Sequence, residues 1–445
     1  MRRPLPGLAR RLNGFDATLI VMGGVVGAGI FVNPSVVAAL ARTTLSIAAA
    51  WILGGIIALI GAFVFAELAR RQPNGGLYGY LRDAYHPVVA FSYGWTALLV
   101  SQSGGMAAAA ITFGKYLAPV TPGHVSEKFW GIAAIVILSS INAFGVRDGS
   151  NVQNALMLLR GAAIVALVVL GAFFAPAWHA AAHVTSAAPA PSPFVLAGFA
   201  AAMIPVLYAY DGFQTAAFVD GELRHPRRTL PIGLVCGMLL VIALYLGVTA
   251  VGLRVLGAEG LAATTTPAFE IARRAIGSVG GTFVALAVSL STLGFLSNQV
   301  LTSPRIYYAM ARDGTFFSSV ARVHPKTRAP IVAIVLQGAA AIVIAAWGRY
   351  EQILNYVVAM DFVFFALAGV ALARLPKPSD ERGGGVPGHP WTTGFFVLAS
   401  VAVVVESLVA APRDTVIGFV ILGSAVPIYF VWRRWRGQGP SPATS

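Results

Sequence analysis

Charged residues are scarce in this sequence of 445 residues: they make up 11% of it, against 57% hydrophobic residues. Soluble globular proteins carry about a quarter charged residues, so this chain has too few to cover a surface that faces water. The scarcity of charge excludes a single soluble core, and the abundance of apolar residues excludes a disordered chain. Cysteine is almost absent too. Because Cys236 stands alone, an intramolecular disulfide is excluded.

Two sequence patterns are also missing. There are no alternating segments of about ten residues, which a transmembrane β-barrel requires, and no glycine-rich loop ends in the Lys-Ser or Lys-Thr of an ATP-binding loop. Instead, apolar residues fall in blocks near the ~20 residues that cross a bilayer as a helix. We predict an all-α polytopic membrane protein with twelve transmembrane helices, at about 14–40, 45–68, 87–118, 128–145, 149–175, 193–220, 229–254, 280–310, 329–347, 351–374, 391–410 and 414–432.

Acidic residues are few, 17 against 31 Lys and Arg, which gives a net charge of +14. Cytoplasmic loops of membrane proteins collect Lys and Arg, so we interpret the excess as a marker of topology and expect no nucleic-acid partner. With both termini in the cytoplasm, 22 basic residues fall on inside segments, eight on outside segments and one, Arg160, within a span. We therefore predict a multi-pass protein of the cytoplasmic (inner) membrane with both termini cytoplasmic. Its first apolar run is interpreted as a retained span rather than a signal peptide.

The segments between the spans also contain sequence patterns that predict structure. Residues 75–86 alternate aromatic and polar side chains at helical spacing, which predicts a cytoplasmic interfacial helix. Residues 266–276 have Pro267 at the start of a helical pattern, which predicts an external cap helix. The Ala/Pro-rich residues 175–193 are expected to form an irregular external loop, and the tail 437–445 is expected to be disordered.

The first and sixth spans each contain helix-breaking residues near their middle. In the first span, residues 23–29 include four glycines, and glycine inside a helix costs about 1 kcal/mol relative to alanine. In the sixth span, Pro205 removes a backbone donor, and Asp211 and Gly212 follow near mid-membrane. Unwound backbone at that depth is tolerated where it lines a cavity. Breaks in matching spans of two halves indicate a transporter's binding site.

These breaks predict a particular ligand. A helix restarting at Ala28 would point the N–H groups of Ala28, Gly29 and Ile30 into the cavity, which suits a carboxylate. The unwound part of the sixth span would offer carbonyls of Tyr208, Ala209 and Asp211, which suit an ammonium. An α-amino acid carries both groups. The alternative is that the glycines only allow close helix packing, but this explains a mid-membrane aspartate poorly.

Several motifs resemble the amino acid–polyamine–organocation superfamily, with bacterial relatives of the L-type amino acid transporters as the closest match. They are GVVGAGIF around residue 27, YAYDGF around residue 210, ELRHPRRTLP at 222–231 and VHPKTRAP at 323–330. The resemblance implies a LeuT-type five-plus-five inverted repeat with broken helices 1 and 6. It places the first repeat at 14–175, the second at 193–374 and two accessory spans at 391–432.

The resemblance also implies which positions bind substrate. The family's backbone binding positions correspond here to Val25, Val26, Gly27, Ala28, Gly29 and Ile30, and to Tyr208, Ala209, Tyr210 and Asp211. Tyr208 matches an aromatic residue that closes over the substrate. Relatives often have serine in place of Ala28, which removes one hydroxyl from the carboxylate pocket, and they vary between aspartate and glycine at the position of Asp211.

Arg160 is about eleven residues into the fifth span, roughly 16 Å deep at 1.5 Å per residue. Arginine is costly at that depth. Many relatives carry a lysine there, beside broken helix 1, where sodium-coupled members hold an ion. We therefore predict that the Arg160 guanidinium substitutes for the ion and ties spans 1 and 5 together. Because arginine keeps its proton, this argues against sodium coupling and weakens proton coupling through Arg160. The alternative is a snorkelling arginine that only packs.

Other polar residues within spans have structural and functional interpretations. Asp361 could line a pathway or make a structural hydrogen bond, and Glu406 is expected to be a packing or oligomer contact. Glu67 is expected to pair with Arg70 and Arg71 at the end of its span. Further hydroxyls and amides could line the pocket or serve packing, at 101–105 in the third span and at Ser289, Ser291 and Thr292 in the eighth.

The sequence thus predicts a secondary active amino acid transporter, most simply a sodium-independent exchanger of neutral L-amino acids that works by alternating access. One alternative is a proton-coupled symporter of the same fold, and a second is an amino acid sensor or channel. An enzyme is disfavoured because no catalytic cluster is present. The expected partners are an amino acid substrate and the lipid bilayer. No cofactor, metal or accessory subunit is indicated.

Overall fold

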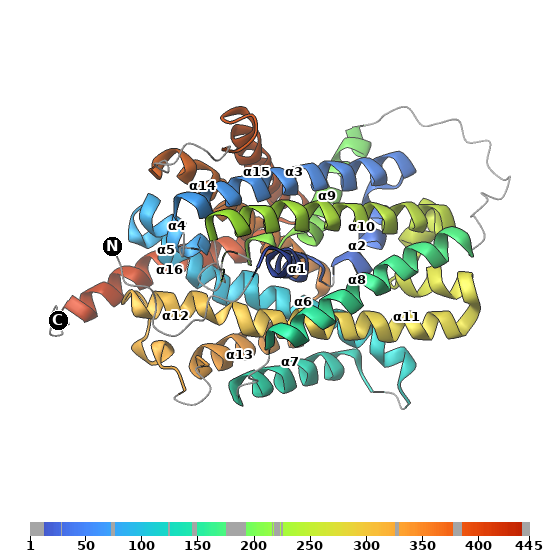
Figure 1. The fold of residues 1–445 in the computed structure, drawn as a ribbon, viewed down its shortest axis with the longest axis horizontal. Helices are drawn as coiled ribbons and strands as arrows, with labels where there is room; N and C mark the ends of the chain where they lie inside the picture. Colours follow the sequence, from blue (N-terminus) through green and yellow to red (C-terminus); the bar gives the residue numbers. More distant parts are fainter. Residues whose placement is uncertain are drawn as a thin grey trace.

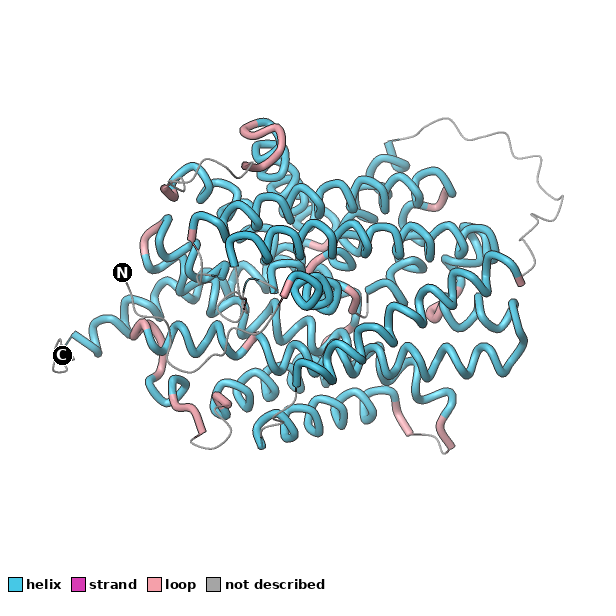
Figure 2. The backbone as a smooth tube through the Cα atoms, in the orientation of Figure 1, coloured by secondary structure: helices cyan, strands magenta, loops and turns pink. Residues whose placement is uncertain are grey.

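The computed structural model describes residues 13–27, 29–72, 76–122, 125–144, 149–174, 193–215, 217, 223, 226–324, 329–376 and 385–437. Their regular structure is helical, and these described residues contain no extended strand (Figure 2). The prediction of an all-α protein is therefore confirmed.

The helices follow the predicted spans closely. They are α1 Gly14–Val25, α2 Gly29–Ala41, α3 Thr44–Arg71, α4 Gly76–Ala84, α5 Pro87–Thr96, a π-helical turn Ala97–Ser101, α6 Gln102–Leu117, α7 Glu127–Phe144, α8 Gly149–Phe173, α9 Pro193–Tyr210, α10 Pro226–Ala263, α11 Pro267–Thr302, α12 Pro304–Arg312, α13 Ile331–Trp347, α14 Tyr350–Arg374, α15 Trp391–Ala410 and α16 Pro412–Gly437. Each predicted span coincides with one or more of them.

Many of these helices can cross a bilayer. Within the described residues, eight are long and apolar enough, or nine if α1 and α2 are one bent span, and Met157–Phe173 and Ile331–Trp347 are shorter apolar helices. Large apolar side chains on α15 point outward, with Trp391 85% and Leu398 70% exposed. Such a surface suits lipid rather than water. The chain is a polytopic helical membrane protein, while the count of twelve crossings stays a prediction.

The two half-helices of the first span, α1 and α2, lie inside the helix bundle. Figure 1 shows long helices side by side, with α1 seen end-on near the middle of the molecule. α1 packs on α10, α2 packs on α9 and α10, and α3 packs on α9 and α10. The first break is thus enclosed by α9 and α10, on which its two half-helices pack.

Most expectations for the connecting segments can be checked. α4 lies within the predicted interfacial helix 75–86, and α11 begins at Pro267 and kinks at Ile276 and Gly277, the end of the predicted cap helix. The φ of Gly277 is +74°, a conformation that glycine adopts without strain. α16 continues to Gly437, the first residue of the predicted tail, and the disorder of that tail stays a prediction. Residues 175–192 and 438–445 lie outside the described residues.

Glu67 near the end of α3 is paired as predicted. Its carboxylate oxygens lie 3.1 Å from Nη1 of Arg70 and 2.8 Å from Nε of Arg71, and the Arg71 guanidinium also donates to the carbonyl of Leu372 on α14. Glu67 is therefore a structural ion-pair partner that fixes the end of α3 against α14.

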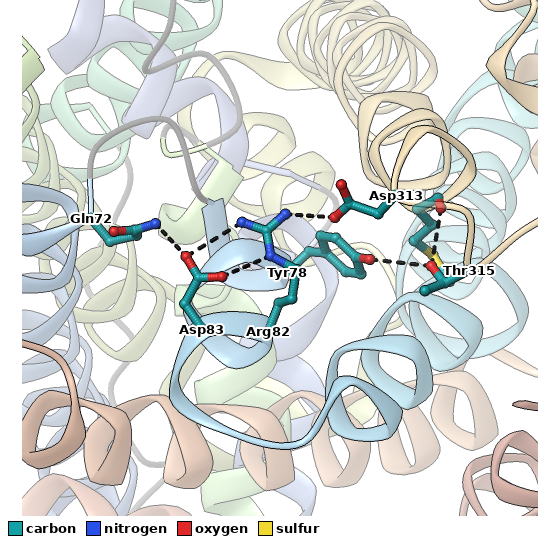
Figure 3. A network of polar contacts seen from close by, with 7 residues as sticks. Gln72, Tyr78, Arg82, Asp83, Asp313 and Thr315 are labelled. Carbon is teal, nitrogen blue, oxygen red and sulfur yellow. Dashed lines mark hydrogen bonds and ion pairs between the residues drawn. The ribbon is translucent and has the colours of Figure 1, made fainter. Parts of the chain in front are cut away.

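A polar network joins α4 to the ends of α3 and α12 (Figure 3). Nη1 of Arg82 lies 2.5 Å from Oδ2 of Asp313, and its Nε lies 2.8 Å from Oδ1 of Asp83. Burial disfavours the guanidinium charge, but these two carboxylates outweigh it and raise the pKa of Arg82. Burial also raises the pKa of Tyr78 to about 12, so its hydroxyl keeps its proton 3.2 Å from that of Thr315.

We expect the network to contribute modestly to stability. Arg82→Ala should lower the apparent melting temperature in detergent more than Asp313→Ala. Arg82→Ala removes the ion pairs with both Asp83 and Asp313, whereas Asp313→Ala leaves the pair between Arg82 and Asp83 in place. Partly exposed ion pairs are worth about 0.2–1 kcal/mol, so the coupling in a double-mutant cycle should lie in that range. Arg273→Ala, which removes a largely exposed pair with Glu270, is the matched control and should change little. Additive losses from Arg82→Ala and Asp313→Ala would contradict the pairing.

Candidate functional site

The first break separates α1 from α2. α1 ends at Val25, α2 begins at Gly29, and the two axes are bent by 45°. The N–H of Gly27 donates to the carbonyl of Val25 over 2.7 Å, instead of to the carbonyl of Gly23 as a helix would require. The carbonyl of Gly23 is thereby released from the helical pattern. Ala28 lies outside the described residues, so the described helix restarts at Gly29.

The second break follows the end of α9 at Tyr210. Gly212 has a φ of +109°, which side chains other than glycine rarely allow, and a 3₁₀ turn follows at 213–215. Oδ1 of Asp211 accepts hydrogen bonds from the N–H of Gly212 over 2.6 Å and from Nε2 of Gln214 over 3.0 Å. The Asp211 carboxyl group therefore helps to shape the turn that it lies in.

The two breaks contact each other through backbone atoms. A Cβ added to Gly24 would lie 2.6 Å from the carbonyl oxygen of Gly212, and one added to Gly29 would lie 2.8 Å from Cα of Ala209. Asn33 of α2 reinforces this contact, because its Nδ2 donates to the carbonyl of Pro205 over 2.5 Å. The glycines are thus required for the close approach of α1 and α2 to α9.

A cavity opens at this contact. Its lining comes from both breaks and from the helices that face them, and consists of Gly24, Val25, Gly27, Gly29, Ser101, Gln102, Gly105, Tyr208, Asp211, Gly212, Gln214, Thr215, Phe295, Gln299, Val357 and Asp361. Five of the ten positions predicted to bind substrate are among them: Val25, Gly27, Gly29, Tyr208 and Asp211.

Of the other five predicted positions, Ala28 lies outside the described residues, and the remaining four are not part of the cavity lining. Val26, Ile30 and Ala209 are buried. The Tyr210 hydroxyl points away, donating to the carbonyl of Trp51 over 3.2 Å. The prediction for these residues concerned their backbone, and it stays a prediction.

Several residues of the cavity were missed by the sequence analysis, or left undecided. Gln214, Thr215, Phe295, Gln299 and Val357 were missed, and Asp361 was left between a pathway and a structural role. The polar segment of the third span does contribute, through Ser101, Gln102 and Gly105. The hydroxyls of Ser289 and Thr292 instead donate to carbonyls of α11 itself.

The cavity wall opposite the breaks is polar. Oε1 of Gln102 accepts hydrogen bonds from Nε2 of Gln299 over 3.2 Å and from Oγ of Ser303 over 2.7 Å. Gln299 is 5% exposed, and its Oε1 has no hydrogen-bond partner among the described residues. Buried polar atoms are normally paired, so this oxygen is an acceptor available to a ligand.

Arg160 lies on the other side of the first break. Its side chain on α8 is 1% exposed, and Nη1 donates to the carbonyls of Val26 over 2.6 Å and Gly23 over 3.3 Å. The Tyr245 hydroxyl on α10 donates to the carbonyl of Val25 over 3.1 Å. Carbonyls released by the break thus receive donors from two neighbouring helices. Cations stabilise helix C-termini, so the guanidinium is well placed at the end of α1.

The described residues contain no group of three or more His, Cys, Asp or Glu side chains that could hold a metal ion. The cavity lining supplies hydrogen-bonding groups, backbone of the two breaks and two carboxyl groups.

Comparison with known proteins agrees with this architecture. A family model described as amino acid permease matches residues 12–432. The chain belongs to the amino acid permease family. The permease is accordingly a transport protein and not an enzyme, and the predicted superfamily resemblance is confirmed.

Curated relatives of the permease align over nearly its full length. It is 28% identical to the serine/threonine exchanger SteT of Bacillus subtilis (strain 168), over 97% of this chain and 99% of that protein. It is 27% identical to the human b(0,+)-type amino acid transporter 1, over 96% of this chain and 89% of that protein. It is 26% identical to the mouse large neutral amino acids transporter small subunit 2, over 96% of this chain and 82% of that protein.

Proposed function

We propose that the permease is a sodium-independent exchanger of neutral L-amino acids in the cytoplasmic membrane, with both termini on the cytoplasmic side. The observation that carries this proposal is the pair of breaks that meet at one cavity. The first-turn N–H groups of α2 have no partners within their own helix and suit a carboxylate, and the turn after Tyr210 supplies carbonyls for an ammonium. The full-length similarity to a serine/threonine exchanger supports exchange of amino acids.

The mechanism we propose is alternating access in a LeuT-type five-plus-five inverted repeat. The repeats are 14–175 and 193–374, followed by the accessory spans 391–432. The cavity lies at the contact between the first helices of the two repeats, where rocking of one repeat against the other would open it to either side. The breaks allow the half-helices to pivot, because few backbone hydrogen bonds cross them.

Sodium independence follows, in this proposal, from Arg160. Its guanidinium already places a positive charge on the carbonyls of Gly23 and Val26. A sodium ion would need such carbonyl oxygens as ligands, and it would be repelled by a buried guanidinium that does not release its proton. Arg160 therefore acts in this proposal as a fixed substitute for the ion.

The test is uptake by purified protein in liposomes. We expect a labelled neutral amino acid to enter liposomes preloaded with unlabelled substrate at least about tenfold faster than empty ones, and replacing sodium with choline should change nothing. Uptake into empty liposomes driven by an imposed pH gradient would instead indicate the proton-coupled symporter. Non-saturable flux without countertransport would indicate a channel, and saturable binding without flux would indicate a sensor.

The same experiment tests whether a second chain is needed. One relative is named as a small subunit. We propose that this permease works without an accessory subunit, so the purified chain alone should catalyse exchange. If exchange appears only in native membranes and is lost on purification, a partner is required.

A further inference from the structure

Two glutamine side chains meet in the cavity wall opposite the breaks. Gln102 on α6 and Gln299 on α11 both line the cavity, and Nε2 of Gln299 donates to Oε1 of Gln102 over 3.2 Å. Oγ of Ser303, four positions after Gln299, donates to the same oxygen over 2.7 Å. An amide oxygen has two lone pairs. Oε1 of Gln102 therefore has a donor for each of them and anchors the other two side chains.

This anchoring fixes the direction of the Gln299 amide. Because its nitrogen is turned toward Gln102, its oxygen is turned away from Gln102. The side of the nitrogen is also packed, since a Cβ added to Gly105 of α6 would lie 3.4 Å from Nε2 of Gln299. Gln299 is 5% exposed, and its Oε1 has no hydrogen-bond partner among the described residues. The wall thus holds a buried acceptor in a fixed orientation.

An unpaired amide oxygen does not by itself make a site, as Gln337 on α13 shows. Gln337 is 1% exposed, its Nε2 donates to Sδ of Met106 over 3.1 Å, and its Oε1 has no partner among the described residues either. Gln337 does not line the cavity. Of the buried, unpaired side-chain atoms in the described part of the chain, only Oε1 of Gln299 belongs to a residue of the cavity lining. A molecule in the cavity can supply the partner that buried polar atoms normally have.

The backbone of the third span is distorted at the same wall. The π-helical turn Ala97–Ser101 ends immediately before Gln102, and the N–H of Gln102 donates to the carbonyl of Ala97. Such turns inside α-helices are rare and are frequent at functional sites. Ser101 and Gln102, the last residue of this turn and the first after it, both line the cavity. Side chains and backbone therefore both mark this wall as more than a packing contact.

The ligand that suits this wall is a neutral side chain that carries a hydrogen-bond donor. Oε1 of Gln299 accepts a hydrogen bond from an O–H or N–H group, which an aliphatic side chain lacks. In the empty cavity, water can donate to this oxygen. An aliphatic side chain that displaces the water leaves the oxygen buried and unpaired, which is costly. The two amides carry no charge with which to pair an ionic side chain.

We propose that Gln299 selects substrates whose side chain carries a hydroxyl or carboxamide group over aliphatic substrates of the same shape. This inference rests on the proposed function, because it places the substrate in the cavity where the two breaks meet. Gln299 is the specificity-determining residue, since its Oε1 receives the donor of the substrate side chain. Gln102 and Ser303 are positioning residues that hold this oxygen toward the cavity. Threonine and asparagine are substrates of the preferred class.

Pairs of amino acids with matched shapes test the proposal. Valine has a methyl group where threonine has its hydroxyl, and leucine has two methyl groups where asparagine has its amide oxygen and nitrogen. The purified full-length chain is placed in liposomes preloaded with alanine, and each amino acid competes with the uptake of external labelled alanine. Because the aliphatic partner leaves an acceptor unpaired, threonine and asparagine should compete at about tenfold lower concentrations than valine and leucine. Equal competition within both pairs would overturn the proposal. A preference within one pair alone would assign the site to that donor group.

A variant assigns the preference to one residue. Gln299→Met keeps the length of the side chain, removes the acceptor and leaves Ser303 as a donor to Gln102. The ratio between threonine and valine should fall by about tenfold in this variant. Gln337→Met is the matched control, because it removes a buried amide with an unpaired oxygen outside the cavity lining, and it should keep the wild-type ratio. An unchanged ratio in Gln299→Met would overturn the assignment.

The positioning role of Gln102 has its own variant. Gln102→Met removes the acceptor that anchors the Gln299 amide but leaves Oε1 of Gln299 in the wall, so the ratio between threonine and valine should fall by less than in Gln299→Met. The ratio compares two substrates on the same protein, so a general loss of folded transporter does not change it. A wild-type ratio in Gln102→Met would show that Gln102 does not position Gln299.

A binding measurement separates the possible failures. A ligand that binds the native state raises its apparent stability, so threonine should raise the melting temperature of the wild-type protein more than valine at the same concentration. This measurement needs neither transport nor a variant, and equal shifts for the two ligands would overturn the selection by Gln299. Absence of alanine–alanine exchange in the wild type would instead refute the proposed function itself.

Discussion

Replacing Gly29 with leucine is expected to reduce uptake by about 100-fold or more, the loss typical of a misplacement of about 1 Å in a binding site. Gly29 begins α2, and a Cβ at this position would lie 2.8 Å from Cα and 3.1 Å from Cβ of Ala209 on α9. The obstacle is backbone, which cannot rotate away as a flexible side chain could. α2 must therefore shift, and the N–H groups that we propose for the substrate carboxylate shift with it.

The measurement is initial uptake per molecule of folded protein, with folding followed by size-exclusion profile and melting temperature. Gly29→Ala tests the same contact with the smallest side chain and should give a smaller loss in the same direction. Gly423→Leu is the matched control on α16, where a Cβ meets nothing within 4 Å, so its uptake should equal that of the wild type. Normal uptake by Gly29→Leu would refute the proposed site.

The features predicted well from the sequence are local ones. The breaks at 26–28 and after Tyr210 were predictable because glycine and proline act on the backbone at their own positions. The kink after the cap helix and the pairing of Glu67 with residues three and four positions away are local in the same sense. Helix ends were less predictable, as the extension of α16 to Gly437 shows, because fraying and capping are decided by a few residues.

The opposite wall of the cavity was less predictable. Phe295 and Gln299 lie on α11, and Val357 and Asp361 on α14, all within long apolar helices. Which face of such a helix lines the cavity depends on how the helix is rotated and packed in the bundle. A helix that is apolar on all sides has little hydrophobic periodicity, so its sequence does not indicate that face. Asp361 was singled out as a polar residue in an apolar span, and Gln299 could have been. The hydrogen bond between Gln299 and Gln102 is a tertiary contact, which the sequence does not indicate.

The role of Arg160 was predictable from the sequence only in part. Its depth in an apolar span marked it as important, and the resemblance to relatives placed it beside the first break. The hydrogen bonds of Nη1 to the carbonyls of Gly23 and Val26 required the structure. Its Nε and Nη2 atoms have no partner among the described residues. Since a buried charge with incomplete pairing is costly, stability alone does not account for this arginine.

Arg160→Ala is therefore expected to impair turnover more than expression. It removes a charged donor from the end of α1, and hydrogen bonds to charged groups are worth about 1.5–3 kcal/mol, which corresponds to a loss of roughly 10- to 100-fold in exchange rate. Tyr245→Phe is a graded comparison. It removes only a neutral donor from the carbonyl of Val25, so its loss should be about tenfold or less.

If Arg160 substitutes for an ion, the exchange rate of Arg160→Ala should also respond to added cations. If the guanidinium acts by placing positive charge on these carbonyls, then a small cation should partly restore exchange in Arg160→Ala, and external sodium or guanidinium supplies one. Neither ion should affect the wild type, whose site is already occupied by its own side chain. An unchanged exchange rate in Arg160→Ala would show that Arg160 only packs. A reduced rate that no cation restores would show that its contribution is the hydrogen-bonded link between α8 and the end of α1.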